Sequence, residues 1–252
     1  MARDLPFDIG IIGWGTRGAR QLTLEHLNIL KNGRDLVVSP GATDDLWELF
    51  RKLKLQIHDI TPIYQSGAIS SQVYRRIAKK VLDLGRRHGR TVFVQYGHPL
   101  VYSKPSELII RESKKLGLRT IISPGISSMD QILCLLGVNI GLRDVQICQA
   151  GHLLMKKKRL NPHMDLVLFQ PGTLGRERLC LSLGARRTGT RQFRKLQRHL
   201  EKFYPKTHPM WIVSLNGALD RSDQTVEATV GDLARLAPAF HVSHTIYIKG
   251  LP

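Results

Sequence analysis

The first half of the chain alternates short apolar runs with longer segments in which apolar and polar residues are mixed. The runs are rich in Val and Ile and only a few residues long, which is typical of strands buried in a parallel sheet. We predict such strands at Ile9–Ile12, Leu36–Val38, Thr91–Val94 and Thr120–Ile122. Strands that alternate with helices predict an α/β fold with a mostly parallel sheet.

Between these runs, apolar residues recur with the spacing of one face of an amphipathic helix. The predicted helices are Leu22–Lys31, Ser71–Leu84, Ser106–Leu116 and Ser127–Leu136. A glycine follows each of them and is expected to end it, because glycine readily adopts the left-handed conformation that closes helices. These glycines are Gly33, Gly85, Gly117 and Gly137.

In the second half the predicted strands are farther apart, and turn-rich, basic segments connect them. They are Val145–Gln149, Leu166–Phe169, Trp211–Leu215 and Thr245–Ile248. The segment Arg191–Phe203 predicts a strongly basic amphipathic helix with one apolar side. We therefore predict two α/β domains, at residues 1–118 and 119–252.

Composition places the chain among soluble globular proteins, because 42% of its 252 residues are hydrophobic and 23% are charged. No apolar stretch reaches the ~18 residues of a membrane-spanning helix. The charged residues at the start exclude a typical signal peptide, so we expect a cytoplasmic protein. The odd number of cysteines, in separate apolar segments, favours buried reduced thiols over disulfide bonds or a metal site. They are Cys134, Cys148 and Cys180.

The net charge of +18, from 38 Lys and Arg against 20 Asp and Glu, is unusually high. Such a charge predicts attraction to an anionic partner, and the candidates are RNA, an acidic peptide or a polycarboxylate metabolite. The few aromatic residues are not interleaved with the basic runs, so the stacking surface of a single-strand binder is missing. Binding of nucleic acid therefore remains an alternative that the pattern does not favour.

Residues 13–18 read GWGTRG, which matches the dinucleotide-binding pattern G-x-G-x-x-G. An NAD-binding fold also needs an acidic residue after its second strand, for the ribose, and a helix that begins at the glycine loop. Here the second strand runs into Ser39-Pro40-Gly41, and the predicted helix begins only near Leu22. We therefore predict a loop whose backbone passes close to another segment or ligand, and not an NAD site.

Two further loops follow predicted strands and carry glycine and proline: residues 96–99, YGHP, and residues 123–128, SPGISS. Ligands bind to open α/β sheets at the carboxyl ends of the strands, so these loops predict a pocket. Ser127 and Ser128 are also in position to cap the helix that follows.

Together with the opening strand and glycine loop, these two loops resemble the tetrapyrrole methylase superfamily. The resemblance covers nearly the whole chain and implies two α/β domains with S-adenosylmethionine in a cleft between them. It also implies that backbone groups and small residues hold the cofactor. The implied cofactor contacts are Tyr96, Gly97, His98, Pro99, Val101, Tyr102, Ser127, Ser128, Phe169, Gln170 and Pro171.

Within the superfamily, His98 stands where porphyrinogen and precorrin methylases usually carry an acidic residue. The G-H-P-L-V-Y loop is more similar to the borosin peptide backbone N-methyltransferases, or to methylases fused to a nucleotide pyrophosphohydrolase. Residues 166–172, LVLFQPG, and residues 150–154, AGHLL, also resemble borosin segments. The resemblance then implies a homodimer whose basic surface binds an acidic leader. Because the chain ends at Pro252, it also implies that the precursor peptide is a separate molecule.

The borosin resemblance implies catalytic roles for three tyrosines: Tyr64, Tyr74 and Tyr96. It places the substrate near Gly13, Trp14, Gly15 and Arg75. Ser70 stands where the family pattern has its catalytic arginine, and Thr61 replaces another tyrosine of the pattern. The alternatives to a peptide substrate are a small tetrapyrrole, RNA, or a binding module without catalysis.

Overall fold

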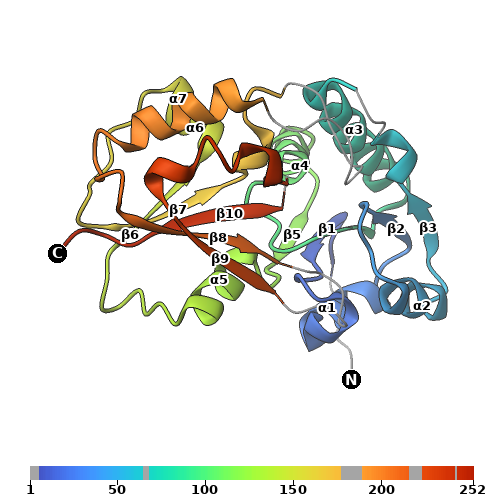
Figure 1. Ribbon diagram of the computed structural model, residues 1–252. Coiled ribbons are helices and arrows are strands. Elements are labelled where there is room, and N and C mark those ends of the chain that lie inside the picture. Colours follow the sequence, from blue (N-terminus) through green and yellow to red (C-terminus); the bar gives the residue numbers. More distant parts are fainter. Residues whose placement is uncertain (1–5, 65–67, 177–188, 216–222, 242) are drawn as a thin grey trace. The chain divides into compact units, whose positions relative to one another are not determined.

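The structure is a computed structural model that describes residues 6–64, 68–176, 189–215, 223–241 and 243–252 (Figure 1). Its contacts divide the chain into two compact units. The first contains the described residues up to Gln131, and the second contains those from Ile132 onward. Each unit has its own sheet and core, and the two are treated separately below.

The first unit is built on a sheet of five parallel strands in the order β3-β2-β4-β1-β5. The strands are β1 (Ile9–Gly13), β2 (Asp35–Val38), β3 (Gln56–Asp59), β4 (Thr91–Gln95) and β5 (Thr120–Ser123). The four strands predicted in this region are confirmed. β3 was not predicted, because this edge strand is polar and only partly buried. β5 pairs with β1, so the strand expected to open the second domain belongs to the first unit, whose boundary falls after Gln131 instead of near residue 119.

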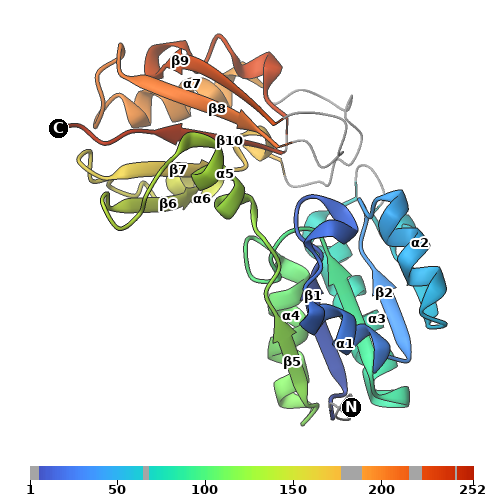
Figure 2. The same cartoon turned by 90° about the horizontal axis from the view of Figure 1, so that it is seen from below.

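Helices cover both faces of this sheet (Figure 2). One face packs against α1 (Leu24–Lys31) and α2 (Asp44–Lys52), and the other against α3 (Ser70–His88) and α4 (Lys104–Lys115). Because strand side chains alternate between faces, Ile11 contributes to the core under α3 and Ile12 to the core under α1. Coverage of both faces explains why the strands read as continuous apolar runs.

The helix α3 extends past Gly85, where the sequence predicted its end, and finishes at Gly89 with a φ of +63°. Gly85 has a packing role instead. A Cβ atom there would lie 2.7 Å from the Ile9 side chain, so the absence of a side chain lets the helix approach β1 closely. The Gly117 and Gly137 predictions are confirmed, because these residues follow α4 and α5 (Ser128–Leu136) with positive φ angles.

The second unit contains a mixed sheet in the order β6-β7-β10-β8-β9. Its strands are β6 (Val145–Gln149), β7 (Asp165–Phe169), β8 (Pro209–Ser214), β9 (Gln224–Thr229) and β10 (His244–Ile248). Only β6 and β7 are parallel, and the other neighbours are antiparallel. α6 (Ala150–Met155) and α7 (Thr190–Leu200) cover one face, above the sheet in Figure 1. The exposed edge strand β9 and the short α6 were not predicted.

Short 3-10 turns complete the described elements: η1 (Gly18–Gln21), η2 (Thr61–Ile63), η3 (Pro171–Thr173), η4 (Val230–Asp232) and η5 (Ala237–Ala239). Cys148 is buried as predicted, but Cys134 is exposed, because only Ile132 of α5 is buried. Cys180 lies outside the described residues. In the described part of the chain, none of the helices has the length and hydropathy needed to span a bilayer.

Candidate functional site

Three glycine loops meet at the carboxyl edge of β1, β4 and β5 in the first unit. A Cβ atom at Gly13 would lie 1.9 Å from the Gly97 carbonyl oxygen. One at Gly125 would lie 2.3 Å from the same oxygen and 2.4 Å from the Gly13 carbonyl oxygen. Real Cβ atoms do not approach carbonyl oxygens so closely, so only glycine fits at either position. The structure thus joins the GWGTRG, YGHP and SPGISS loops through their backbones. We call this contact of Gly13, Gly97 and Gly125 the glycine junction.

Backbone hydrogen bonds fix the first two of these loops to each other. Trp14 N donates to Gln95 O at 2.9 Å, and Gly97 N donates to Gly15 O at 2.8 Å. Gly97 has a left-handed φ of +68°, and no atom lies within 4 Å of the position that its Cβ would occupy. The Gly97 backbone therefore borders open space, where a ligand can contact it directly.

The amide groups of the GWGTRG loop are bound by side chains of the protein itself. Gln21 Oε1 accepts hydrogen bonds from Thr16 N at 2.6 Å and from Arg17 N at 3.0 Å. Asp45 Oδ2 accepts one from Ala19 N at 3.0 Å. The helix that follows this loop, α1, begins only at Leu24, and the short 3-10 turn η1 lies between the loop and α1. The loop therefore lacks the means by which dinucleotide folds hold a pyrophosphate.

The side chain of Trp14 is 1% exposed and belongs to the core between the sheet, α1 and α2. The Trp14 ring therefore packs in the core instead of lining a substrate surface, as the resemblance had implied. The reason is the alternation along β1, which continues past Gly13 and directs the ring to the same face as Ile12.

The first turn of α1 holds the SPGISS loop in place. The His26 ring is fully buried, and its Nε2 lies 2.9 Å from Pro124 O. Because His26 Nδ1 accepts a hydrogen bond from Thr23 N at 3.1 Å, Nε2 carries the ring proton and donates it to Pro124 O. Burial lowers the His26 pKa, which favours this uncharged form. Glu25, next to His26, accepts a hydrogen bond from the Ser123 hydroxyl.

A buried glutamine fixes the YGHP turn. Gln95 Oε1 accepts hydrogen bonds from the Ser103 hydroxyl at 2.6 Å and the Ser106 hydroxyl at 3.1 Å, and its Nε2 donates to His98 O at 3.4 Å. His98 Nδ1 accepts a hydrogen bond from Leu100 N at 3.0 Å. Nδ1 therefore stabilises the turn, and contact between the His98 ring and a ligand would use Nε2 or the ring face.

Ser127 caps α5, as the sequence predicted. Its hydroxyl accepts hydrogen bonds from Met129 N at 3.1 Å and Asp130 N at 3.3 Å, and it donates to Asp130 Oδ2 at 2.7 Å. Ser128 is the first residue of the helix and is half-buried. The cap fixes the position at which the SPGISS loop ends.

Several apolar side chains of these loops remain exposed at the strand ends. Tyr96 is 43% exposed and Tyr102 is 40% exposed, and Tyr102 has a positive φ of 54° that is unusual for a residue with a side chain. Leu100 and Ile126 are 54% and 37% exposed. Pro99 is buried and Val101 is half-buried. The glycine junction is therefore flanked by apolar side chains that have no full cover in this unit.

The structure brings Tyr64 and Tyr74 together against the same core, beneath α3. Burial, and secondarily the proximity of Tyr74, raises the pKa of Tyr64 well above its ordinary value, and burial also raises the pKa of Tyr74. Both hydroxyls therefore keep their protons at neutral pH. A tyrosine acts as a base near neutral pH only if a cation or a hydrogen bond lowers its pKa, whereas the surroundings here raise the pKa of both tyrosines.

The arginine expected near the substrate lies on a different side of α3. Arg75 is exposed, and its Nε donates to Ser71 O at 3.1 Å along the same helix. Ser70 is the first residue of α3 and precedes Tyr74 by one helical turn. This spacing places Ser70 and Tyr74 on one face of the helix, from which Arg75 is rotated away.

The remaining predicted cofactor residues lie at the end of β7 in the second unit, where Phe169 is the last residue of the strand and Gln170 and Pro171 follow it. Phe169 is buried and pairs with Thr245 of β10. Gln170 has a left-handed φ of +55°, and its carbonyl oxygen accepts hydrogen bonds from Thr173 N at 3.0 Å and the Thr173 hydroxyl at 2.8 Å. The FQPG loop is thus a defined turn with a strained residue, which is typical of functional loops.

Residues 8–234 match the family of tetrapyrrole (corrin/porphyrin) methylases. The chain belongs to this family. Members of this family are methyltransferases that use S-adenosylmethionine, the cofactor that the loop motifs implied.

Curated proteins similar to this chain include borosin precursors. A methyltransferase/ribosomally synthesized type I borosin cyclic peptide precursor from Cerrena unicolor is 24% identical over 98% of this chain and 60% of its own length. A second type I precursor, from Mycena rosella, is 25% identical over 98% of this chain and 61% of its own length. The chain thus spans about 60% of these relatives.

Solved structures show that this methylase has the family fold. Uroporphyrin-III-C-methyltransferase from Thermus thermophilus has a TM-score of 0.64 at 15% identity, covering 96% of this chain and 91% of that one. Cobalt precorrin-4 methyltransferase has a TM-score of 0.64 at 16% identity, covering 97% of both chains. These matches confirm the predicted α/β fold with two sheets.

In the first unit, the glycine junction has the features that the resemblance implies for a cofactor site, which are exposed backbone groups and small residues. Gly13 and Gly125 add no side chain at the strand ends, and the Gly97 backbone borders open space. The exposed rings of Tyr96 and Tyr102 supply apolar surface beside it. Such surroundings suit a ligand that is bound through backbone groups and flat apolar contacts, and the individual cofactor contacts stay a prediction.

Proposed function

We propose that this methylase transfers methyl groups to backbone amide nitrogens of a separate peptide. The observation that carries the proposal is the similarity of nearly the whole chain to curated borosin methyltransferase precursors, at 24% and 25% identity over 98% of its residues. His98, in place of an acidic residue, and the LVLFQPG segment support the same subgroup. The net charge of +18 suits an acidic peptide supplied as a separate molecule.

The proposed cofactor contacts are the residues of three loops: 96–99 with 101 and 102, 127–128, and 169–171. Bound there, S-adenosylmethionine supplies an electrophilic methyl group. Gln95, His26 and the Ser127 cap act as positioning residues, because their hydrogen bonds fix the first two loops without requiring a ligand. The FQPG turn is positioned by Thr173 in the same way.

The chemistry requires help at the amide, whose nitrogen lone pair is delocalised into the carbonyl group. Methylation replaces the N–H proton, which is released to solvent. Loss of this proton makes the nitrogen nucleophilic and places negative charge on the carbonyl oxygen, and donors aimed at that oxygen stabilise the charge. Tyr64 and Tyr74 are suited to donate, because their raised pKa values keep both hydroxyls protonated. We therefore assign them the role of hydrogen-bond donors to the substrate oxygen and not that of bases.

A methyl-transfer assay in trans tests the proposal. The purified chain, S-adenosylmethionine and short peptides encoded beside its gene are incubated, and intact peptide masses are measured. We expect additions of one methyl mass that require both enzyme and cofactor. Methylation of a porphyrinogen or precorrin, with all peptides unchanged, would overturn the proposal.

A small-molecule tetrapyrrole methylase is the second candidate, because a polycarboxylate substrate also suits the net charge of +18. The position of His98 argues against it, since those enzymes usually carry an acidic residue there. The same assay with uroporphyrinogen in place of the peptide separates the two candidates directly. RNA is a third, weaker candidate, and an oligonucleotide added to the assay tests it.

A further inference from the structure

The second unit carries a broad groove of about 1220 Å³ that the glycine junction and the FQPG turn do not explain. Its walls are α6 with the chain that follows it, the segment after η3, and α7. Six lysine and arginine residues line it: Lys157, Arg159, Arg176, Lys195, Arg198 and Lys202. Among the described residues that line the groove, there is no aspartate or glutamate.

The sequence of α7 builds one wall through two adjacent stripes. Phe193, Leu196 and Leu200 are buried against the sheet. Lys195, Arg198 and Lys202 recur with the same helical spacing on the neighbouring side and line the groove. The basic residues of α7 are therefore directed to one surface by the burial of its apolar stripe.

Specific contacts hold the other walls against α7. His199 Nε2 lies 2.8 Å from Lys158 O, which ties the chain after α6 to α7. At Gly175, with a φ of +70°, a Cβ atom would lie 2.9 Å from the Gln192 side chain, so glycine allows the segment after η3 to approach α7. The groove is thus a fixed feature of this unit and not a gap between loose side chains.

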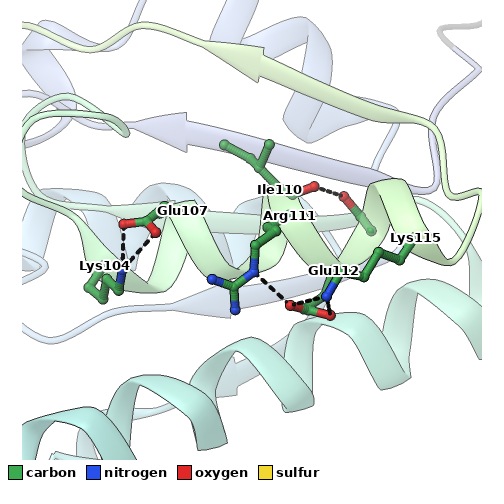
Figure 3. Close-up of polar contacts among 7 residues, drawn as sticks. Lys104, Glu107, Ile110, Arg111, Glu112 and Lys115 are labelled. Atoms are coloured by element: carbon green, nitrogen blue, oxygen red, sulfur yellow. Dashed lines mark hydrogen bonds and ion pairs between the residues drawn. The ribbon is translucent and has the colours of Figure 1, made fainter.

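The charges on α4 of the first unit provide a contrast. There, Lys104 binds Glu107 at 2.6 Å and Lys115 binds Glu112 at 3.0 Å, so acidic neighbours offset the basic side chains (Figure 3). The groove brings lysines and arginines from three segments together, and the described residues of its lining include no carboxylate. Like charges gathered this way repel one another, and an anionic ligand relieves the repulsion.

The apolar part of the lining indicates which anion fits. Met155 is 72% exposed and lies with Leu154 and Phe203 among the cations. Phosphate groups of RNA would use the charges but not these aliphatic contacts, and the edge of the His199 ring already packs against Phe203. The volume of about 1220 Å³ also exceeds the ~300–1,000 Å³ of small-molecule pockets.

We propose that this groove binds a peptide segment that combines acidic with apolar side chains. Its carboxylates pair with Lys195, Arg198 and Lys202, and its apolar side chains contact Met155 and Phe203. Recognition of a helix or extended segment in such a groove is a common mode of peptide binding. That the segment belongs to the same molecule as the methylated residues rests on the proposed function above.

Binding is tested without cofactor, by fluorescence anisotropy of a labelled synthetic peptide in which Glu and Leu follow a helical period. A Lys-Leu peptide of the same length and an oligouridylate RNA serve as comparison probes. The groove variant is Lys195→Gln/Arg198→Gln. The matched control is Arg86→Gln/Arg87→Gln, which removes two exposed charges from the last turn of α3 and so lowers the net charge equally.

We expect the groove variant to bind the Glu-Leu peptide about tenfold more weakly, equivalent to ~1.4 kcal/mol, with the control close to wild type. Met155→Ser should weaken the peptide and leave RNA binding unchanged. Equal losses in both double variants, or tighter binding of RNA than of peptide at the groove, would overturn the proposal. Thermal melting curves of each variant confirm that it is folded.

The test of the groove and the test of the proposed function can give different results. A peptide that binds in the groove but is never methylated would leave the groove proposal standing and count against the proposed function. A peptide that is methylated, but binds the groove variant as tightly as wild type, would support the proposed function and overturn the groove proposal.

Discussion

At the scale of single residues, the site depends on positions that require glycine, either because a Cβ atom would clash or because φ is left-handed. Gly13, Gly97 and Gly125 bring three loops into backbone contact, and this contact decides where the exposed tyrosine rings stand. His26 and Gln95 hold the same loops from beneath through buried hydrogen bonds. The site is therefore preorganised by residues that are not themselves proposed to touch the substrate.

Gly13→Ala tests the junction. The new Cβ atom would lie 1.9 Å from the Gly97 carbonyl oxygen, so the loops must separate. We expect a loss of about 1–3 kcal/mol in the free energy of unfolding and weaker binding of S-adenosylmethionine. Chemical denaturation and calorimetric titration measure the two effects. Gly189→Ala is the control, because a Cβ atom there has no neighbour within 4 Å. Similar losses in both variants would contradict the assigned role.

Tyr74→Phe tests the donor role. Removing one oxyanion donor typically lowers kcat by about 10²-fold or more, and we expect KM to change little. Because burial raises the pKa of Tyr74, ionisation of its hydroxyl should affect the rate only above the ordinary tyrosine value of about 10. A rate that rises with a tyrosine-like pKa near neutrality, and is lost in Tyr74→Phe, would show a base instead.

At the scale of elements, the pattern of apolar residues and the local turn signals predicted those helices and strands that depend on residues close together in the sequence. The central strands of the first sheet were found because both of its faces are covered, whereas the edge strands β3 and β9 are polar and were missed. Gly85 was misread as a helix end, since its packing against Ile9 is a contact between residues far apart in sequence. The loops of the site were found by motif, but the tie between His26 and Pro124 spans 98 positions and leaves no local signal.

A buried cluster of one carboxylate and two histidines joins three elements of the first unit, away from the glycine junction. Asp35 of β2 is fully buried, and its carboxylate oxygens lie 2.7 Å from His58 Nε2 of β3 and 2.9 Å from His88 Nδ1 of α3. Burial alone would raise the Asp35 pKa, but hydrogen bonds and charge from the two histidines outweigh it, and the pKa lies below its usual value. The ionised carboxylate therefore stabilises the fold.

Asp35→Asn tests this cluster through the pH dependence of unfolding. Since the folded pKa is lowered, the stabilisation is complete above the unfolded pKa of about 4 and is lost as the pH falls through the folded value. We expect the variant to be about 2 kcal/mol less stable than wild type near neutral pH, with the difference shrinking in acid. Asp83→Asn, which breaks an exposed pair with Lys79, should cost under ~1 kcal/mol. A gap that does not change with pH would contradict the account.

At the scale of the whole chain, the net charge of +18 is distributed unevenly. On the surface of α4, glutamates offset the basic residues, whereas the charged residues described in the groove of the second unit are all basic. The sequence predicted the charge and the basic helix but not the groove, because residues of α6 and the segment after η3 meet α7 only in the fold. Peptide binding should therefore weaken steeply as salt is added, and anisotropy titrations at increasing ionic strength measure this.

The central claim is methylation of peptide backbone nitrogen, and fragmentation mass spectrometry tests it most directly. The chain is incubated with a candidate precursor peptide and S-adenosylmethionine carrying an isotope-labelled methyl group. We expect labelled methyl groups on fragment ions that place them on backbone amide nitrogens, in residues whose side chains cannot be methylated. Label confined to side chains, or transferred only to a tetrapyrrole or RNA in the same mixture, would contradict the account.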